Sequence, residues 1–283
     1  MDPRFPLSRL TLEARSVVDE LSFVALHDVA EVARRLGVEH RLIGAHMVTL
    51  HAYRWGLGAE LYRETRDVDL GVPLEVARDP ALIGALEETG YRRSAGNRLV
   101  RSIADVPVEV EAPGAEATRE AAVDVLIPAY TSRARDNVRV GEHLTTTEVG
   151  GLAEALRRQP VQVRLQLGRL NGQTLEVDVL LPDEVSVVIL RALVWRRRGA
   201  GTDAVDLWRS LEIAIKAGLR PGDFSSETAR TAAEIIRTAF LGDRAPAVGS
   251  IVTARGSSAV EAARLRTRLK ALADRVVGTR RGS

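Results

Sequence analysis

Cysteine is absent from this sequence of 283 residues. Without it, the chain can form neither disulfides nor thiolate metal sites. Long apolar runs are absent too, since none reaches the roughly 18 residues that a membrane-spanning helix needs. The first residues also lack the basic-then-apolar layout of a secretory signal. We therefore expect a cytoplasmic protein that has no membrane partner.

Lysine is almost absent as well. Of the 40 basic residues, only Lys216 and Lys270 are lysines, and the others are arginines. Arginine suits bidentate contacts with phosphate, although a genome that favours arginine codons is the simpler explanation. The net charge of +2 and the pI of 9.3 permit a nucleic-acid partner without arguing for one. With 45% hydrophobic and 28% charged residues, the chain has the composition of a globular protein with a substantial core.

The first two thirds of the chain mix helical and strand-like segments. Three- and four-residue apolar spacing predicts a helix over residues 8–37, which Gly37 ends. Further helices are predicted over 46–55 and 80–89, and Asn171-Gly172 indicates a hairpin turn. Strands are predicted at 41–44, 66–73, 98–103, 106–111, 123–127, 161–167 and 175–181, with polar connections at 114–122 and 128–151.

From Asp183 onward the pattern is helical throughout. Helices are predicted over 183–198, 202–217, 226–241 and 257–277, and the first three begin at plausible N-cap residues. This segregation of strands and helices predicts an α+β domain at 1–182, with a mixed β-sheet and flanking helices, and a C-terminal helical domain at 183–283.

Two aspartates alternate with apolar residues in the segment from Arg63 to Val72. In an extended chain, Asp67 and Asp69 point to the same face while their apolar neighbours point into the core. Two carboxylates held this close repel each other unless a cation sits between them. Magnesium prefers oxygen ligands of this kind and commonly binds one or two carboxylates together with substrate phosphates. A simpler alternative is an exposed strand start whose acids pair with Arg63 and Arg66.

Gly44 and Asp124 strengthen the metal interpretation. Gly44 lies between a predicted strand and a predicted helix, where a glycine lets the backbone approach a phosphate and the helix N-terminus offers free N–H groups. Asp124 is a lone acid in an apolar strand, so it is a candidate for the third carboxylate of a metal triad. A salt bridge across the sheet would satisfy it equally well. Other acids in comparable places are Glu109, Glu111 and Asp178.

This order of motifs resembles the nucleotidyltransferase superfamily, with a closer likeness to the AbiEii/MenT nucleotidyltransferase toxins of bacterial type IV-like toxin–antitoxin systems. The likeness spans roughly residues 40–215. The segments that carry it are Leu42-Ile-Gly44-Ala45-His46, Arg63-x-Thr65-x-Asp67-x-Asp69, Val123-Asp124-Val-Leu-Ile-Pro and Asp203-Ala-Val-Asp206-Leu-Trp.

The resemblance implies a transfer of a nucleoside monophosphate from a nucleoside triphosphate to an RNA acceptor, tRNA in some members. The enzyme would depend on Mg²⁺ or Mn²⁺ and would have a cognate antitoxin protein as its partner. Asp67, Asp69 and Asp124 would be the catalytic carboxylates and metal ligands. The nucleotide-binding positions would be Gly44, Ala45, His46, Arg63, Thr65, Arg191 and Asp206.

Two positions depart from the family pattern. Ala45 stands where glycine or serine is usual, and Arg191 stands where the family often has lysine. We expect Asp206 to pair with Arg191, although a solvated helix face would also explain Arg191. These departures motivate an alternative, a regulatory protein that keeps the fold and binds nucleotide without catalysis. A third hypothesis is a nucleotidyltransferase that modifies a small molecule such as an antibiotic.

Overall fold

The structure is a computed structural model that describes residues 7–106, 119–131, 133–255 and 259–279. The chain divides into two compact units, one made of residues 1–47 and 62–182 and the other of 48–61 and 183–283. The domains predicted from the sequence differ from these units in the placement of residues 48–61. No helix in the described part of the chain is long and apolar enough to cross a membrane.

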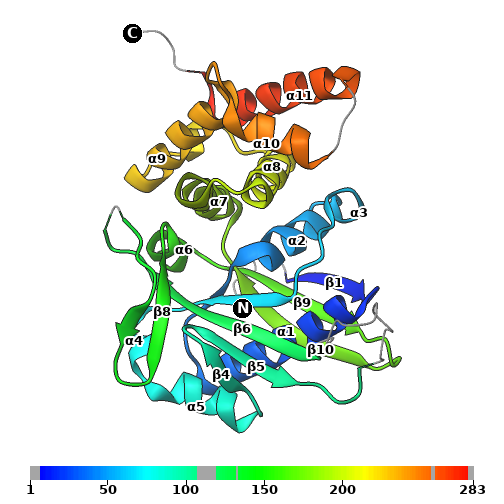
Figure 1. Cartoon of the computed structure of the whole chain (residues 1–283), viewed down its shortest axis with the longest axis vertical. Helices are drawn as coiled ribbons and strands as arrows, with labels where there is room; N and C mark the ends of the chain where they lie inside the picture. Colours follow the sequence, from blue (N-terminus) through cyan, green and yellow to red (C-terminus); the bar gives the residue numbers. More distant parts are fainter. Residues whose placement is uncertain (1–6, 107–118, 132, 256–258, 280–283) are drawn as a thin grey trace. The chain divides into compact units, whose positions relative to one another are not determined.

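The α+β class predicted from the sequence is confirmed (Figure 1). The first unit combines two sheets with flanking helices, whereas every described element of the second unit is a helix. The predicted strand at 106–111 lies outside the described residues except for residue 106. Glu109 and Glu111 therefore lie outside them as well.

The smaller sheet of the first unit corrects one prediction. Its order is β1-β9-β10, and β1 pairs with β9 in parallel while β9 and β10 form an antiparallel hairpin. Residues 8–13 are therefore a strand and not the start of a helix, because Leu10 and Leu12 lie opposite Leu165 and Leu167 in the parallel pairing. The predicted hairpin turn is confirmed, and Gly172 has the positive φ that it requires. The strands are β1 (Ser8–Glu13), β9 (Val161–Gly168) and β10 (Thr174–Leu181).

The larger sheet carries the aspartate strand near its centre. Its main path is β2-β3-β6-β5-β4, and β8 pairs with residues 126–128 of β6, beyond the part of β6 that pairs with β5. Residues 128–151, predicted as a polar connection, contain β7 and β8, which obtain their partners from each other and from β6. The strands are β2 (Arg41–Leu42), β3 (Asp67–Gly71), β4 (Arg92–Ala95), β5 (Arg98–Ser102), β6 (Glu120–Pro128), β7 (Val138–Val140) and β8 (Leu144–Val149).

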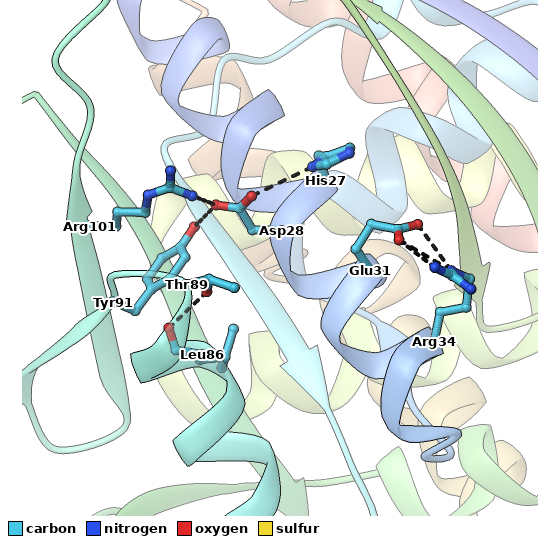
Figure 2. A network of polar contacts seen from close by, with 8 residues as sticks. All are labelled: His27, Asp28, Glu31, Arg34, Leu86, Thr89, Tyr91 and Arg101. Carbon is cyan, nitrogen blue, oxygen red and sulfur yellow. Dashed lines mark hydrogen bonds and ion pairs between the residues drawn. The ribbon is translucent and has the colours of Figure 1, made fainter.

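Helix α1 (Val17–Leu36) packs against β3 and β6 of the larger sheet and against α5 (Pro80–Glu88). Ser16 caps its first turn, and Gly37 ends the helix as predicted, in the left-handed conformation. Figure 2 shows how Asp28 fastens this helix to the sheet: its Oδ2 accepts hydrogen bonds from the Tyr91 hydroxyl at 3.1 Å and from Arg101 on β5 at 2.6 Å. Two shorter helices of this unit are α4 (Leu74–Arg78) and α6 (Leu152–Arg157).

The second unit is built around an apolar core of helices. Trp208, Phe240 and Leu269 are among its buried side chains. Asp183 and Ser226 cap helices as predicted, because each side chain accepts a hydrogen bond from a backbone N–H three residues later. The helices of residues 183–283 are α7 (Glu184–Arg198), α8 (Gly201–Lys216), η1 (Pro221–Asp223), α9 (Glu227–Ile236), η2 (Arg237–Leu241), α10 (Pro246–Ala254) and α11 (Ala259–Val277).

Helix α2 (Gly44–Arg54) begins in the first unit and continues into the second, where α3 (Gly58–Leu61) follows it. The strand–glycine–helix order predicted around Gly44 is thus confirmed, with β2 before the glycine and β3 after the helices.

Candidate functional site: an acid row on the larger sheet

Asp67, Asp69 and Asp124 lie on one face of two neighbouring strands, and we call them the acid row. In the parallel pairing of β3 with β6, Asp69 stands directly opposite Asp124, and Asp67 lies two residues before Asp69. The intervening Val68 and Leu70 are almost completely buried, as the alternating pattern predicts. All three carboxylates remain partly accessible to solvent. The sheet therefore brings together the three acids predicted from the sequence.

A cation does lie between two of these acids, but it is an arginine. Arg98 on β5 stands opposite Asp124 in the antiparallel pairing of β5 with β6. Its Nη2 is 3.3 Å from Asp124 Oδ2 and also makes an ion pair with Asp67. The Arg98 side chain is 37% exposed. No sequence pattern pointed to Arg98, although a salt bridge from Asp124 across the sheet was one of the expectations.

The electrostatics of the row follow from partial burial and crowding. Burial raises the pKa of Asp124; Arg98 opposes this shift, and the Asp67 carboxylate adds to it. For Arg98, burial lowers the pKa, but Asp124 and Asp67 outweigh it, so the net pKa is raised. Asp124 is therefore a stronger base than an ordinary aspartate, and Arg98 remains a cation.

Gly44 lies so close to the Asp69 side chain that no larger residue fits at its position. It has a φ of +72°, and a Cβ placed on it would lie 1.8 Å from Asp69 Oδ2. No other residue type fits both the backbone and this approach. The backbone is joined to the same strand, because the Ile43 N–H donates to the Asp69 carbonyl at 2.9 Å. The Asp69 carboxylate thus lies beside the first turn of α2, where the helix dipole favours negative charge.

Ala45 and His46 follow Gly44 in the first turn of α2, and both are buried. Burial lowers the pKa of His46 to about 4, and the positive charge of Arg63 acts in the same direction. The His46 Nε2 atom is buried and has no hydrogen-bond partner among the described residues. This histidine is therefore neutral near pH 7 and close to the glycine turn in sequence.

The segment that leads into β3 contains Arg63 and Thr65, both half-buried. Its course is fixed by the N-terminal end of α1: the Tyr62 hydroxyl donates to Asp19, and the Ser16 hydroxyl donates to Glu64. These contacts position the chain just before Asp67. The contacts give no specific role to Arg63 or Thr65, so their predicted role in nucleotide binding stays a prediction.

Asp178, an alternative third acid, lies in the other sheet. It is on β10 and forms a bidentate pair with Arg164 of β9, with both contacts at 2.7 Å. That pair lowers the pKa of the Asp178 carboxyl. Asp178 therefore does not join the acid row. The other two alternatives, Glu109 and Glu111, lie outside the described residues.

Arg191 and Asp206 belong to the second unit, where they form a buried cluster with Arg209. Asp206 lies 3.7 Å from Arg191 and 3.0 Å from Arg209, and Arg209 also donates to Thr49 at 2.9 Å. The expected pairing of Arg191 with Asp206 is confirmed. The solvated-face alternative is wrong for Arg191, which is only 7% exposed. Two of its guanidinium nitrogens, Nε and Nη2, are buried without a hydrogen-bond partner in the described part of the chain.

The acid row has the donor type that a magnesium ion prefers, namely carboxylate oxygens. Its arrangement, however, does not fit an ion as it stands. Within the described ranges, no group of three or more His, Asp or Glu side chains is arranged to hold a metal. Asp67 and Asp124 share Arg98, and Asp69 faces the start of α2.

The comparisons with known proteins give a likeness in structure but none in sequence. No family model matches the chain, and no curated protein matches its sequence. A solved structure described as an antigenic nucleotidyltransferase-like protein from Paracoccidioides brasiliensis is similar, with a TM-score of 0.41 and 15% identity over 81% of this chain and 92% of that one. A likeness at this level does not assign roles to residues.

Proposed function

We propose that this protein is a nucleotidyltransferase that moves a nucleoside monophosphate from a nucleoside triphosphate to an acceptor hydroxyl. The observation that carries the proposal is the register of β3 and β6, which sets Asp69 opposite Asp124 with Asp67 on the same face. Gly44 adds a glycine turn and a helix start directly beside Asp69. Carboxylates on neighbouring strands, next to a helix N-terminus that favours anions, are what triphosphate chemistry needs.

The reaction follows from these groups. The acceptor oxygen forms a bond with the α-phosphorus, the bond from that phosphorus to the β-phosphate oxygen breaks, and pyrophosphate leaves. Asp124 suits the role of the base that takes the proton of the acceptor hydroxyl, since burial raises its pKa. The proposal includes Mg²⁺ or Mn²⁺ as a cofactor held by the acid row; when bound, such an ion neutralises charge on the leaving pyrophosphate.

The nucleotide-binding residues of the proposal are Gly44, Ala45, His46, Arg63, Thr65, Arg191 and Asp206. Arg191 has the strongest chemical case in this set. Its two buried N–H groups without partners are donors of the kind that a phosphate or carboxylate would satisfy. A guanidinium stays charged in proteins, so Arg191 acts as a fixed cation and not as a proton donor. Asp206 then serves to orient Arg191.

For the acceptor we propose RNA, specifically tRNA, and for the biological role a growth-inhibiting cytoplasmic toxin with a cognate antitoxin. These finer statements depend on the resemblance of the motifs around Gly44, Asp67, Asp124 and Asp206 to the AbiEii/MenT toxins. The arginine-rich composition is compatible with a nucleic-acid acceptor.

The test is to incubate the protein with Mg²⁺ or Mn²⁺, each labelled nucleoside triphosphate and total tRNA. We expect label on RNA, and a loss of at least about 100-fold for Asp69→Asn, because that change removes a charge from the row while keeping its shape. The matched control is Asp178→Asn, which removes an acid from the other sheet and should leave transfer unchanged.

The other outcomes separate the alternatives. Label on a small acceptor would instead support a small-molecule nucleotidyltransferase. Triphosphate binding without any transfer would support the regulatory protein suggested by Ala45 and Arg191. A fully active Asp69→Asn variant would contradict the assignment of the acid row.

A further inference from the structure

We infer that Arg98 is a built-in competitor for the metal ion of the acid row, so that the ion binds by displacing the Arg98 guanidinium. This inference rests on the proposed function, because it takes the acid row as the metal site. The carboxylates of the acid row are suitable metal ligands, yet they are not arranged to hold an ion while Arg98 lies between them. Displacement of Arg98 would account for both observations.

The first step is the position of Arg98. Three neighbouring strands place Asp69, Asp124 and Arg98 in one line across the sheet, since Asp124 is the register partner of both other residues. Side chains that stand opposite each other on neighbouring strands share a face. The guanidinium contacts the two acids Asp67 and Asp124 at once. A cation bound by these same two carboxylates would have to occupy the place that the guanidinium now takes.

The second step is that Arg98 is free to leave. Its side chain is 37% exposed, as is that of Asp67, so the guanidinium can turn into water. The Asp124 side chain is only 17% exposed, and an ion that takes the place of the guanidinium would neutralise its charge. Exposed ion pairs of this kind are held weakly.

The third step concerns charge. The guanidinium neutralises charge on Asp67 and Asp124, so its removal without a replacement leaves these two carboxylates without the cation that they share. Like charges at this spacing repel each other and would increase the demand for another cation. If the Arg98-paired state comprises about 90% of molecules, the apparent affinity for a metal ion is weakened about tenfold, because only the remaining fraction is competent to bind.

The experiment measures Mn²⁺ binding to the full chain by calorimetry, with no nucleotide present. We expect Arg98→Ala to bind Mn²⁺ about tenfold more tightly than the unchanged protein. Without divalent ions, the same variant should melt at a lower temperature than the unchanged protein, and Mn²⁺ should raise its melting temperature by more. Arg98→Lys keeps one positive charge but cannot span two carboxylates as a guanidinium does, so its affinity should fall between the two.

A matched control separates competition from a general effect of charge. Arg92 is an exposed arginine on the adjacent strand β4 and pairs with Glu120, an acid that is not part of the acid row. Arg92→Ala removes the same charge and should leave Mn²⁺ affinity unchanged. An equal gain in Arg92→Ala would overturn the inference, and so would an unchanged, weaker or undetectable affinity in Arg98→Ala.

The fate of the inference can be told apart from that of the proposed function. If Arg98→Ala gains affinity but the unchanged protein transfers no nucleotide, the inference stands and the function fails. If the protein transfers nucleotide while Arg98→Ala gains no affinity, the function stands and the inference is wrong.

Discussion

The acid row and the cluster of Arg191, Asp206 and Arg209 use the same two residue types in opposite proportion. In the first unit, two acids share one arginine, and the arginine is 37% exposed. In the second unit, one acid is shared by two arginines, and the three side chains are at most 8% exposed. In the first arrangement the arginine that joins the acids is open to water, whereas in the second all three side chains are enclosed by the protein.

This difference shows that burial determines whether an ion pair can exchange its partners. An exposed pair gains little from its contact, because water and salt screen it, and so its partners can be exchanged. A buried pair is held in place, because breaking it leaves a charge in a medium that solvates it poorly. We therefore expect the acid row to act as an exchangeable binding site and the arginine cluster to act as a fixed structural and anion-orienting element.

The largest effect is expected from removing the shared acid of the second unit. Asp206→Ala should lower the free energy of unfolding by about 3–5 kcal/mol, because Arg191 and Arg209 would then be buried without their carboxylate. Urea unfolding followed by circular dichroism measures this. Asp178→Ala is the control and should cost less than about 1 kcal/mol, since its pair with Arg164 is exposed. A similar small loss for Asp206→Ala would contradict the contrast between the two regions.

Acid should destabilise the two units in different pH ranges. In the folded protein, burial lowers the pKa of His46 from 6.5 to about 4. As the pH falls from 6.5 towards 4, this histidine therefore binds a proton in the unfolded chain before it does so in the folded protein, and stability is lost. Partial burial of Glu184 by itself raises its pKa, but His51, Trp55 and Arg54 lower the pKa from 4.5 to about 2. Its contribution is therefore present above 4.5 and is lost as the pH falls towards 2.

Each of these two pKa shifts corresponds to a change of roughly 3 kcal/mol in the free energy of unfolding across its pH range. His46→Gln should flatten the pH dependence of the unfolding free energy between pH 6.5 and 4, and Glu184→Gln should flatten it between 4.5 and 2. Denaturant unfolding over this pH range measures both slopes. If His46→Gln leaves the upper range unchanged, the histidine is not buried in its neutral form.

The sequence predicted what local patterns encode. Alternation identified β3 and β6 with their three acids, glycines marked the ends of α1 and the start of α2, and N-cap residues marked α7 and α9. It misassigned Ser8–Glu13, whose partner strand begins at Val161, because periodicity does not report a pairing between segments so far apart. Arg98 was missed for the same reason, since its role depends on the register of three strands and not on its neighbours in sequence.

Two glycines offer a matched test of how tightly the acid row is built. Gly44 and Gly199 have similar positive φ angles, +72° and +62°, but an added Cβ meets Asp69 at Gly44 and nothing within 4 Å at Gly199. Gly44→Ala should cost about 2–3 kcal/mol, from left-handed strain together with crowding, and Gly199→Ala about 1–2 kcal/mol, from strain alone. Thermal unfolding gives both values. Equal losses would mean that Asp69 moves aside freely.

The smallest loss of stability is expected for Asp67→Ala, and this variant gives the clearest comparison with Asp206→Ala. Asp67→Ala removes an acid that is 37% exposed, so the free energy of unfolding should change by less than about 1 kcal/mol. Because exposed charges are screened by salt, even this change should shrink between ~0.05 M and ~1 M salt, where the Debye length falls well below 10 Å. The loss in Asp206→Ala should persist at both concentrations, since buried charges are screened far less. If Asp67→Ala instead produced a large loss of stability that salt did not reduce, the acid row would be a rigid structural element like the cluster of Arg191, Asp206 and Arg209. Its carboxylates would then not be available to exchange Arg98 for a metal ion.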